Sequence, residues 1–179
     1  MNCPVCKSRS LIAHQLEAGL AALKCETCGG HWINSFQFWK WQEAHHDTRR
    51  PRADIEPVAE PREAKLCAEC GRILIRYRVG HSLPFSIDRC GQCGGLWFDR
   101  NEWEVLRGRN LVEEIHLIFS ATTQQRFRRE DSFRRSLGEK DFAEVMRLKA
   151  WLGAHAHRGD ILVFLQSSED SDKPSVDRR

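Results

Sequence analysis

The chain has no long apolar run. No apolar stretch approaches the roughly 18 residues that a membrane-spanning helix needs, so we expect no membrane contact. Met1-Asn2-Cys3 places a cysteine three residues from the start of the sequence, so we expect no secretory signal before the cysteines. We therefore expect a cytoplasmic protein whose cysteines are not held in disulfides.

Signatures of catalysis are missing as well. The sequence shows no Ser/His/Asp arrangement, no phosphate-binding loop and no pair of catalytic carboxylates. The pair His155-x-His157 has no nearby carboxylate set, so we interpret it as turn residues rather than metal ligands. We interpret His45-His46, at the start of the expected linker, in the same way. We expect a protein that is not an enzyme and has no small-molecule substrate.

All eight cysteines fall into two sets of the same form. In each set two CxxC pairs are separated by 18 or 19 residues, a spacing typical of two-knuckle zinc sites. Four thiolates close a tetrahedral zinc site and leave no position for water, so such a zinc is structural. Disulfides are one alternative, but they need an oxidising compartment. A redox CxxC is another, but such motifs come singly and within a βαβ pattern, and neither condition holds here. We predict two structural Zn²⁺ ions, with ligands Cys3, Cys6, Cys25 and Cys28 in one site and Cys67, Cys70, Cys90 and Cys93 in the other.

The similarity between the two halves extends beyond the ligands. Cys28-Gly29-Gly30-His31-Trp32-Ile33-Asn34 corresponds to Cys93-Gly94-Gly95-Leu96-Trp97-Phe98-Asp99 at a constant offset of 65. This is an internal repeat of about 40 residues, spanning 1–43 and 66–106. A unit of this size has too small a core to fold alone, so zinc must contribute folding free energy. We expect the second glycine of each pair to allow close backbone approach or a positive φ.

Each repeat predicts a hairpin followed by a helix. In the second, alternating residues from Ile73 to Val79 and from Phe85 to Arg89 flank the turn Gly80-His81-Ser82. In the first, Leu11–Leu16 and Leu20–Lys24 are less regular. The segments 34–37 and 99–102 have the pattern of a capping box, which predicts a helix start in both repeats.

Trp32 and Trp97 lie between the last zinc ligand and the helix of their repeats. We interpret each as a core residue that covers its own metal site. The alternative is an exposed platform on which a nucleic-acid base stacks.

These residues resemble the transcription-factor-IIB-type zinc-ribbon family of small prokaryotic proteins. The resemblance rests on CxxC, a hairpin and then C-x-G-x-W-x-[DN]-x-x-[EQ], and it covers both repeats. It implies the same eight metal ligands and the tryptophans Trp32 and Trp97. The first repeat has Asn34 and Gln37 where the second has the family's Asp99 and Glu102. The resemblance implies a role in transcription or nucleic-acid binding.

The fold class that follows is small, α+β and metal-dependent, with two tandem ribbons and a helical C-terminal region. We expect a linker over 44–65, which contains Pro51, Pro57 and Pro61 and would let the ribbons move independently unless their aromatics dock them. Residues 107–165 should form a helix over about 110–136, a break at Gly138 and a helix over about 139–153. The run 161–165 is either a short helix beginning near Asp160 or a buried strand. The tail 166–179 is polar and predicted to be disordered.

Two basic groups are candidates for nucleic-acid binding. The formal net charge is +3, but each zinc ion bound by four thiolates adds −2, so the chain with two zinc ions has a net charge of −1. This charge disfavours non-specific binding to nucleic acid. Locally, Phe127 and Phe133 interleave with arginines, although Glu130 and Asp131 could make this a solvated helix face. The candidates are Arg76, Arg78, Arg126, Arg128, Arg129, Arg134 and Arg135.

Aromatic residues suggest a second class of partner. A ribbon cannot bury so many aromatics on one short helix, so some must contact the other ribbon, the C-terminal helices or another protein. These candidates are Phe36, Phe38, Trp39 and Trp41. The sequence thus predicts a zinc-binding interaction module that is related to nucleic acid or transcription. The alternative is a protein adaptor or assembly factor that uses exposed ribbon aromatics and makes no nucleic-acid contact.

Overall fold

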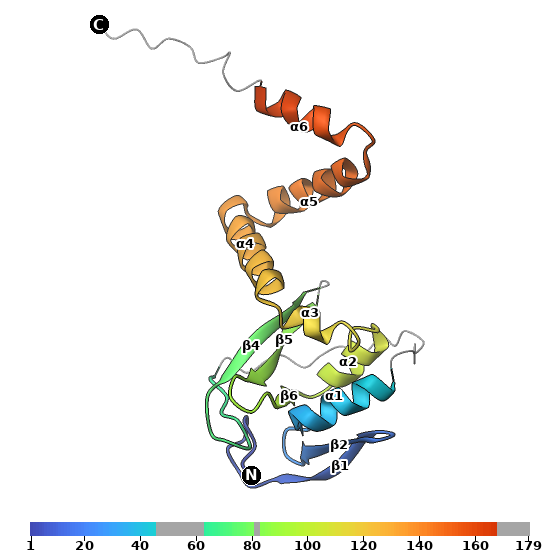
Figure 1. The fold of residues 1–179 in the computed structure, drawn as a ribbon. Coiled ribbons are helices and arrows are strands. Elements are labelled where there is room, and N and C mark those ends of the chain that lie inside the picture. Colours follow the sequence, from blue (N-terminus) through green and yellow to red (C-terminus); the bar gives the residue numbers. More distant parts are fainter. Residues whose placement is uncertain (46–62, 81–82, 168–179) are drawn as a thin grey trace, which may run out of the picture. The chain divides into compact units, whose positions relative to one another are not determined.

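A computed structural model describes residues 1–45, 63–80 and 83–167 (Figure 1). It divides into two compact units, Met1–Arg128 and Arg129–Arg179. The first holds both repeats, and the second holds the remaining helical part. The predicted fold class, two tandem ribbons followed by helices, is confirmed. Most of the predicted linker and tail, 46–62 and 168–179, lies outside the described residues.

Ribbon 1 and ribbon 2 have the same order of elements. In ribbon 1 these are β1 (Leu11–Glu17), β2 (Leu20–Cys25), β3 (His31–Ile33) and α1 (Ser35–Ala44). In ribbon 2 they are β4 (Leu74–Gly80), β5 (Leu83–Cys90), β6 (Leu96–Phe98) and α2 (Glu102–Gly108). Both predicted hairpins are confirmed, and the turn residues 81–82 lie outside the described part.

The two ribbons share one antiparallel sheet with the strand order β1-β2-β3-β6-β5-β4. β3 and β6 pair at its centre, with Trp32 opposite Trp97, His31 opposite Phe98 and Ile33 opposite Leu96. Because the repeat offset maps Trp32 onto Trp97, this pairing has approximate two-fold symmetry, like the isologous interface of a dimer. The ribbons are therefore docked, which is the alternative to independent motion that the sequence left open.

The repeated glycines are explained by this docking. The first of each pair, Gly29 and Gly94, has a positive φ of 76° and 70°. The second, Gly30 and Gly95, faces the indole of the opposite ribbon: the ring of Trp97 lies against Gly30 and the ring of Trp32 against Gly95. The prediction that each tryptophan is a core residue is confirmed by its burial. Each ring also packs across the ribbon interface, against a glycine of the other ribbon.

Strand alternation gives the sheet two different buried faces. One face carries large apolar residues, among them Ile33, Ile87 and Phe98, and is covered by α1 and α2 (Figure 1). The other face carries the cysteines together with Trp32 and Trp97.

The helix aromatics of the two ribbons meet over the first face. Trp103 of α2 lies 6.4 Å from Phe38 and 5.7 Å from Trp41 between ring centroids. Phe38 and Trp41 are buried and Trp39 is partly buried. Of the contacts that the sequence left open for these aromatics, Phe38 and Trp41 make the one with the other ribbon. Phe36 alone of the four is exposed.

The predicted helix over 110–136 is interrupted. Asn110 has φ 55°, a left-handed conformation that ends α2 without allowing a new helix to begin. The chain continues through turns into the short helix α3 (Ile115–Ile118). This segment adds three side chains to the buried core: Leu111, Val112 and Ile115. The long helix α4 (Ala121–Leu137) begins after Ser120, whose hydroxyl accepts from the backbone N–H of Thr123 at 3.2 Å.

The start of α4 is attached to the edge strand β4. The Gln124 side chain accepts from the Arg78 backbone N–H at 3.1 Å and donates to the Arg78 carbonyl at 2.9 Å. Phe127 packs against Gly80, which has no side chain to obstruct the ring. These contacts cover backbone groups of an edge strand that would otherwise be open to another chain.

The second unit contains the rest of α4 with α5 (Glu139–Ala154) and α6 (Arg158–Ser167). The break at Gly138 and the helix after it are confirmed, and the run 161–165 is helix rather than buried strand. Gln166 and Ser167, which we assigned to the disordered tail, belong to α6. None of the helices in the described segments is long and apolar enough to cross a bilayer.

We predict that Gly30→Ala destabilises the ribbon body, because the added methyl group would overlap the Trp97 ring. Overpacking of this kind costs about 1–3 kcal/mol. The loss should appear in urea denaturation of the zinc-loaded protein, followed by tryptophan fluorescence. Gly153→Ala is the matched control, since no atom lies within 4 Å of the added methyl and the residue is helical. Equal stability of the two variants would contradict the proposed packing.

Candidate metal centres

The eight cysteines form two compact clusters. In each, the four Sγ atoms lie within 4.8 Å of one another. Distances between sulfurs are 3.6 Å for Cys3–Cys28 and 3.9 Å for Cys6–Cys25 in ribbon 1. They are 3.5 Å for Cys67–Cys93 and 3.4 Å for Cys70–Cys90 in ribbon 2.

These distances fit zinc and not disulfides. A tetrahedron of sulfurs with Zn–S bonds of about 2.3 Å has edges of about 3.8 Å, whereas a disulfide bond measures about 2.05 Å. All eight cysteines are free thiols in the structure. The two sites thus fit two structural Zn²⁺ ions, as predicted.

Backbone turns at the knuckles direct hydrogen-bond donors at the sulfurs. The N–H of Cys6 points to Cys3 Sγ at 3.3 Å, and the N–H groups of Glu69 and Cys70 point to Cys67 Sγ at 3.4 and 3.3 Å. Donors of this kind partly neutralise thiolate charge, which allows four thiolates to gather around one dication.

The free thiols within one site differ in acidity. Burial raises the pKa of Cys3 to about 11. Burial also opposes ionisation of Cys25, but the Cys28 backbone N–H and the Ser10 hydroxyl, 2.9 Å away, together lower its pKa to about 6. In ribbon 2, the backbone donors of Cys93 and Gln92 outweigh burial and lower the pKa of Cys90 to about 7. Cys25 and Cys90 therefore lose their protons more readily than an ordinary thiol, and a bound dication deprotonates the thiols that coordinate it.

Lys65 is a part of the centre that sequence reasoning missed. We assigned it to the linker, but it is buried, with 3 % of its surface exposed. Its ammonium group donates to Asp88 Oδ2 and Asp99 Oδ2, both at 2.5 Å. Burial opposes the charge, yet the two carboxylates hold the Lys65 pKa above its usual value. The only signal in the sequence is a lone lysine just before Cys67, and nothing there indicates burial.

Asp99 connects this lysine to the central tryptophan. Its Oδ1 accepts from Trp97 Nε1 at 2.7 Å, and its backbone N–H donates to Glu102 Oε2 at 2.7 Å. The predicted capping box is thus half present, because the Asp99 side chain binds Lys65 and Trp97. In ribbon 1, Asn34 does cap α1 by accepting from Phe36 N–H at 3.0 Å, and its amide donates to Glu69 of ribbon 2 at 3.2 Å.

A second buried pair across the ribbons was also missed. Glu17, at the end of β1, accepts from Arg107 Nε at 2.8 Å and from Trp103 Nε1 at 3.1 Å. Both charged side chains are buried. Since the partners are 90 residues apart in the chain, no local pattern could have indicated the pair.

The comparisons with known proteins agree with this geometry. Residues 2–44 and 66–106 each match the family model described as transcription factor zinc-finger, of the TFIIB zinc-ribbon type. Both segments are zinc ribbons similar to the TFIIB type. They cover a little under half of the chain. No curated protein and no solved structure matches it.

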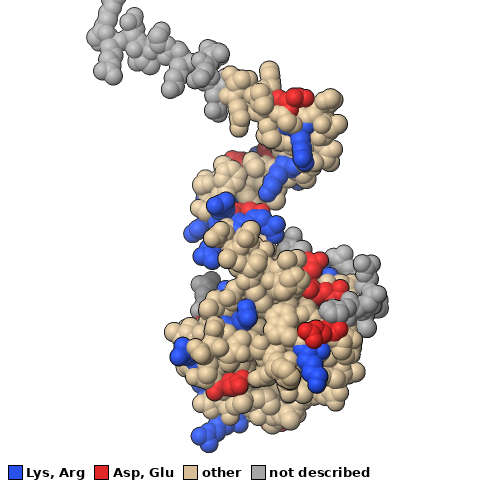
Figure 2. All heavy atoms as spheres, in the orientation of Figure 1, with Lys and Arg blue, Asp and Glu red and all other residues tan. Residues whose placement is uncertain are grey.

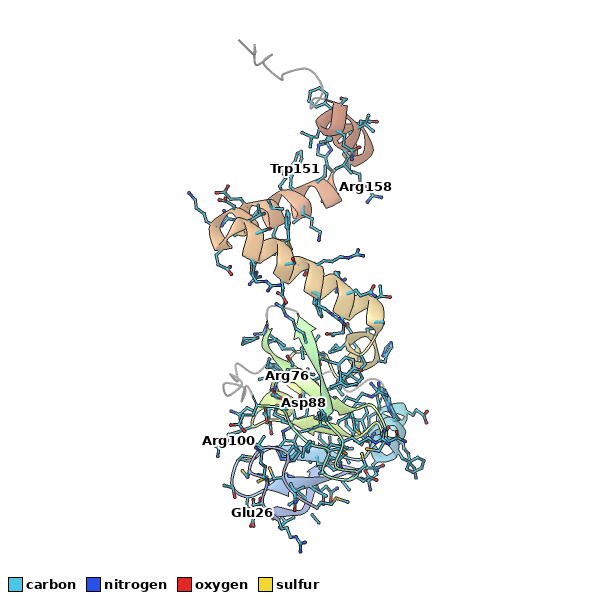
Figure 3. All side chains as sticks on the ribbon, turned by 90° about the vertical axis from the view of Figure 1, so that its left-hand side faces the viewer. Glu26, Arg76, Asp88, Arg100, Trp151 and Arg158 are labelled. Atoms are coloured by element: carbon cyan, nitrogen blue, oxygen red, sulfur yellow. The ribbon has the colours of Figure 1, made fainter. Side chains whose placement is uncertain are left out.

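The candidate arginines have different surroundings. Arg76 lies beside Asp88, with Nε 3.5 Å from Oδ1 (Figure 3), and Arg78 lies over the Phe127 ring at 5.7 Å. Arg134 lies over the Phe142 ring at 4.6 Å and 3.7 Å from the Glu139 carboxylate. Figure 2 shows basic side chains around α4 with acidic ones among them. The α4 candidates with exposed side chains are Arg126, Arg128, Arg129 and Arg135.

We predict two zinc ions per chain, and that strong chelators unfold the ribbon body while the second unit keeps its helices. The reason is that Cys3, Cys25, Cys67 and Cys90 share one buried cluster with both tryptophans, so loss of metal opens the whole body. α5 and α6 contain no metal ligand. Elemental analysis should give a zinc-to-protein ratio near two. Circular dichroism after chelation should retain helical signal, and its complete loss would contradict the division into two units.

We predict that Lys65→Met destabilises the body by about 3–5 kcal/mol, because it removes the ammonium shared by two buried carboxylates and leaves Asp99 without a cation, while Arg76 remains beside Asp88. The measurement is chemical denaturation with zinc in excess. Lys7→Met is the control: its ion pair with Glu63 is exposed on both sides, so the change should be less than about 1 kcal/mol. A Lys65 variant as stable as this control would show that the buried network is dispensable.

Proposed function

We propose that this chain is a transcription-related nucleic-acid-binding module that uses α4 for the contact and the paired zinc ribbons as scaffold. The observation that supports this most is the density of arginine on α4. Five arginines fall within residues 126–135, against Glu130 and Asp131. Four of them are exposed. The TFIIB-type family of both ribbons supports the same field of function.

The ribbons themselves are poorly suited to direct base contact. Trp32 and Trp97, the candidate stacking residues, are buried in the ribbon interface. Phe127 is buried against Gly80, whereas Phe133 is exposed and available to stack on a base. The ribbons are also negative once zinc is bound, which opposes phosphate binding. In this proposal their task is to fold around zinc and hold the start of α4 through Gln124 and Phe127.

The arginines on α4 do not form a single face. Arg126 and Arg129 are three residues apart and share one side, while Arg128 and Arg135 are seven apart and share another. Such a helix suits contact with phosphates on both sides of a groove or strand. It does not suit a single row of base-specific contacts.

The experiment is a gel shift with the full chain at several salt concentrations. Replacing Arg126, Arg128, Arg129 and Arg135 by Gln should weaken binding strongly and lower the salt slope by about 0.9 for each lost phosphate contact on duplex. Arg134 is left in place because it packs on Phe142. The matched control replaces Lys7, Arg9, Lys40 and Arg72 by Gln, which removes the same charge from exposed ribbon positions. Equal weakening by the control would place the surface on the ribbons instead.

A protein adaptor is the second candidate, and one observation favours it. Large apolar side chains are exposed on α5 and α6, including Trp151 and Phe164, and exposed apolar patches usually mark protein interfaces. Among the ribbon aromatics only Phe36 still supports this reading. Affinity capture from lysate with and without nuclease separates the candidates: partners that persist after nuclease favour the adaptor.

A further inference from the structure

One side of α5 combines exposed apolar residues with charges in a particular order. Asp141, Glu144, Leu148 and Trp151 recur at helical spacing and so lie on one side of the helix, which we name the outer stripe. All four are exposed, Leu148 and Trp151 by 54 % and 53 %. On the opposite side, Phe142 is buried beneath Arg134. α5 thus already has an inner side that packs on α4.

The charges of the inner side are used within the unit. Arg134 lies 3.7 Å from Glu139, and Lys149 lies 3.7 Å from Glu130. By contrast, Asp141, Glu144 and Arg147 form no ion pair with any residue that the structure describes. The outer stripe therefore presents unmatched charge beside unmatched apolar surface.

The charges beside the stripe are mainly acidic first and basic second. Asp141 and Glu144 precede Leu148 and outnumber the exposed Lys140 beside them, whereas Arg147 flanks the stripe at Leu148 and Arg158 follows at the start of α6 (Figure 3). Two copies related by a two-fold axis across the helix run antiparallel. The acidic half of one stripe then faces the basic half of the other, and the helix dipoles oppose each other favourably. A parallel pairing would put like charges together.

The apolar residues agree with this arrangement. Leu148 lies near the boundary between the two charged halves, so in an antiparallel pair it meets its own counterpart. Trp151 then packs against the partner helix on either side of that centre. α6 adds four consecutive exposed side chains, Leu162 to Leu165, with 46–70 % of their surfaces open. A helix apolar on all sides is normally covered in a folded protein.

We propose that the outer stripe of α5 is a self-association surface, whose partner is the same stripe of a second copy of this chain in antiparallel orientation. Each copy supplies both halves of the complementary charge pattern, which is why a second copy fits this surface. The proposal does not depend on nucleic-acid binding. If α4 does bind phosphates, the dimer would carry two such helices and bind with higher avidity.

The test uses sedimentation equilibrium of the full, zinc-loaded, nuclease-treated chain. An acid-reversed variant, Asp141→Lys with Glu144→Lys, and a base-reversed variant, Arg147→Glu with Arg158→Glu, each place like charges across the pair. Either variant alone should dimerise on the order of tenfold more weakly, or more, than the unaltered chain. An equimolar mixture of the two should recover dimer, because the acid-reversed copy, now basic in both halves, then faces the base-reversed copy, which is acidic in both. Leu148→Ser with Trp151→Ser should abolish it.

Two controls make the result specific. Circular dichroism must show unchanged helical content in every variant. Arg9→Glu with Lys40→Glu reverses exposed charge on ribbon 1 and should leave the dimer intact. A monomeric unaltered chain, reversed variants that still dimerise, or a mixture that fails to recover dimer would each overturn the proposal. If the α4 variant loses nucleic-acid binding and still dimerises, the result supports self-association that is independent of nucleic-acid binding.

Discussion

The pairing of β3 with β6 is the constraint on which the rest of the ribbon body depends. Only three residues of each strand pair, yet they place Trp32 and Trp97 opposite each other at the centre of a six-stranded sheet. Each indole then extends over a glycine of the other ribbon, a position where any side chain would collide. A ribbon too small to build a core alone thereby obtains half of its core from its repeat. The tandem copy acts as a covalently linked dimer partner.

Zinc and buried charge complete that core. The cysteines of both sites share a buried cluster with the tryptophans, so the metal fixes the positions of the chain around the indoles. A zinc ion bound by four thiolates has a net negative charge, and the buried carboxylates of Asp88 and Asp99 add further negative charge to ribbon 2. Lys65 and Arg76 supply the opposing charge from within ribbon 2. Trp97 donates to Asp99, which connects this charge network to the ribbon interface.

The body and the helical part have different physical characters. In the body, aromatics and charged pairs join the ribbons, as Phe38 with Trp103 and Glu17 with Arg107 do. On the helices beyond it, arginine and large apolar side chains are open to solvent. Functional contacts are therefore expected on the helices, since the ribbon surfaces richest in aromatics are already covered by one another. Gln124 and Phe127 fix the first turns of α4 on β4 within the body.

The sequence by itself determined the features that depend on local spacing. Eight cysteines in two matched sets gave the metal centres, the repeat gave two ribbons, and Gly138 marked a helix break, because ligand geometry and backbone conformation are set within a few residues. Only the tertiary structure decided which residues meet across the pseudo-two-fold interface. Lys65 with two carboxylates, Glu17 with Arg107, and each tryptophan over the other ribbon's glycine are long-range pairs. Their partners are brought together by the pairing of β3 with β6 and by the packing of α1 on α2, and no periodicity in the chain records that contact.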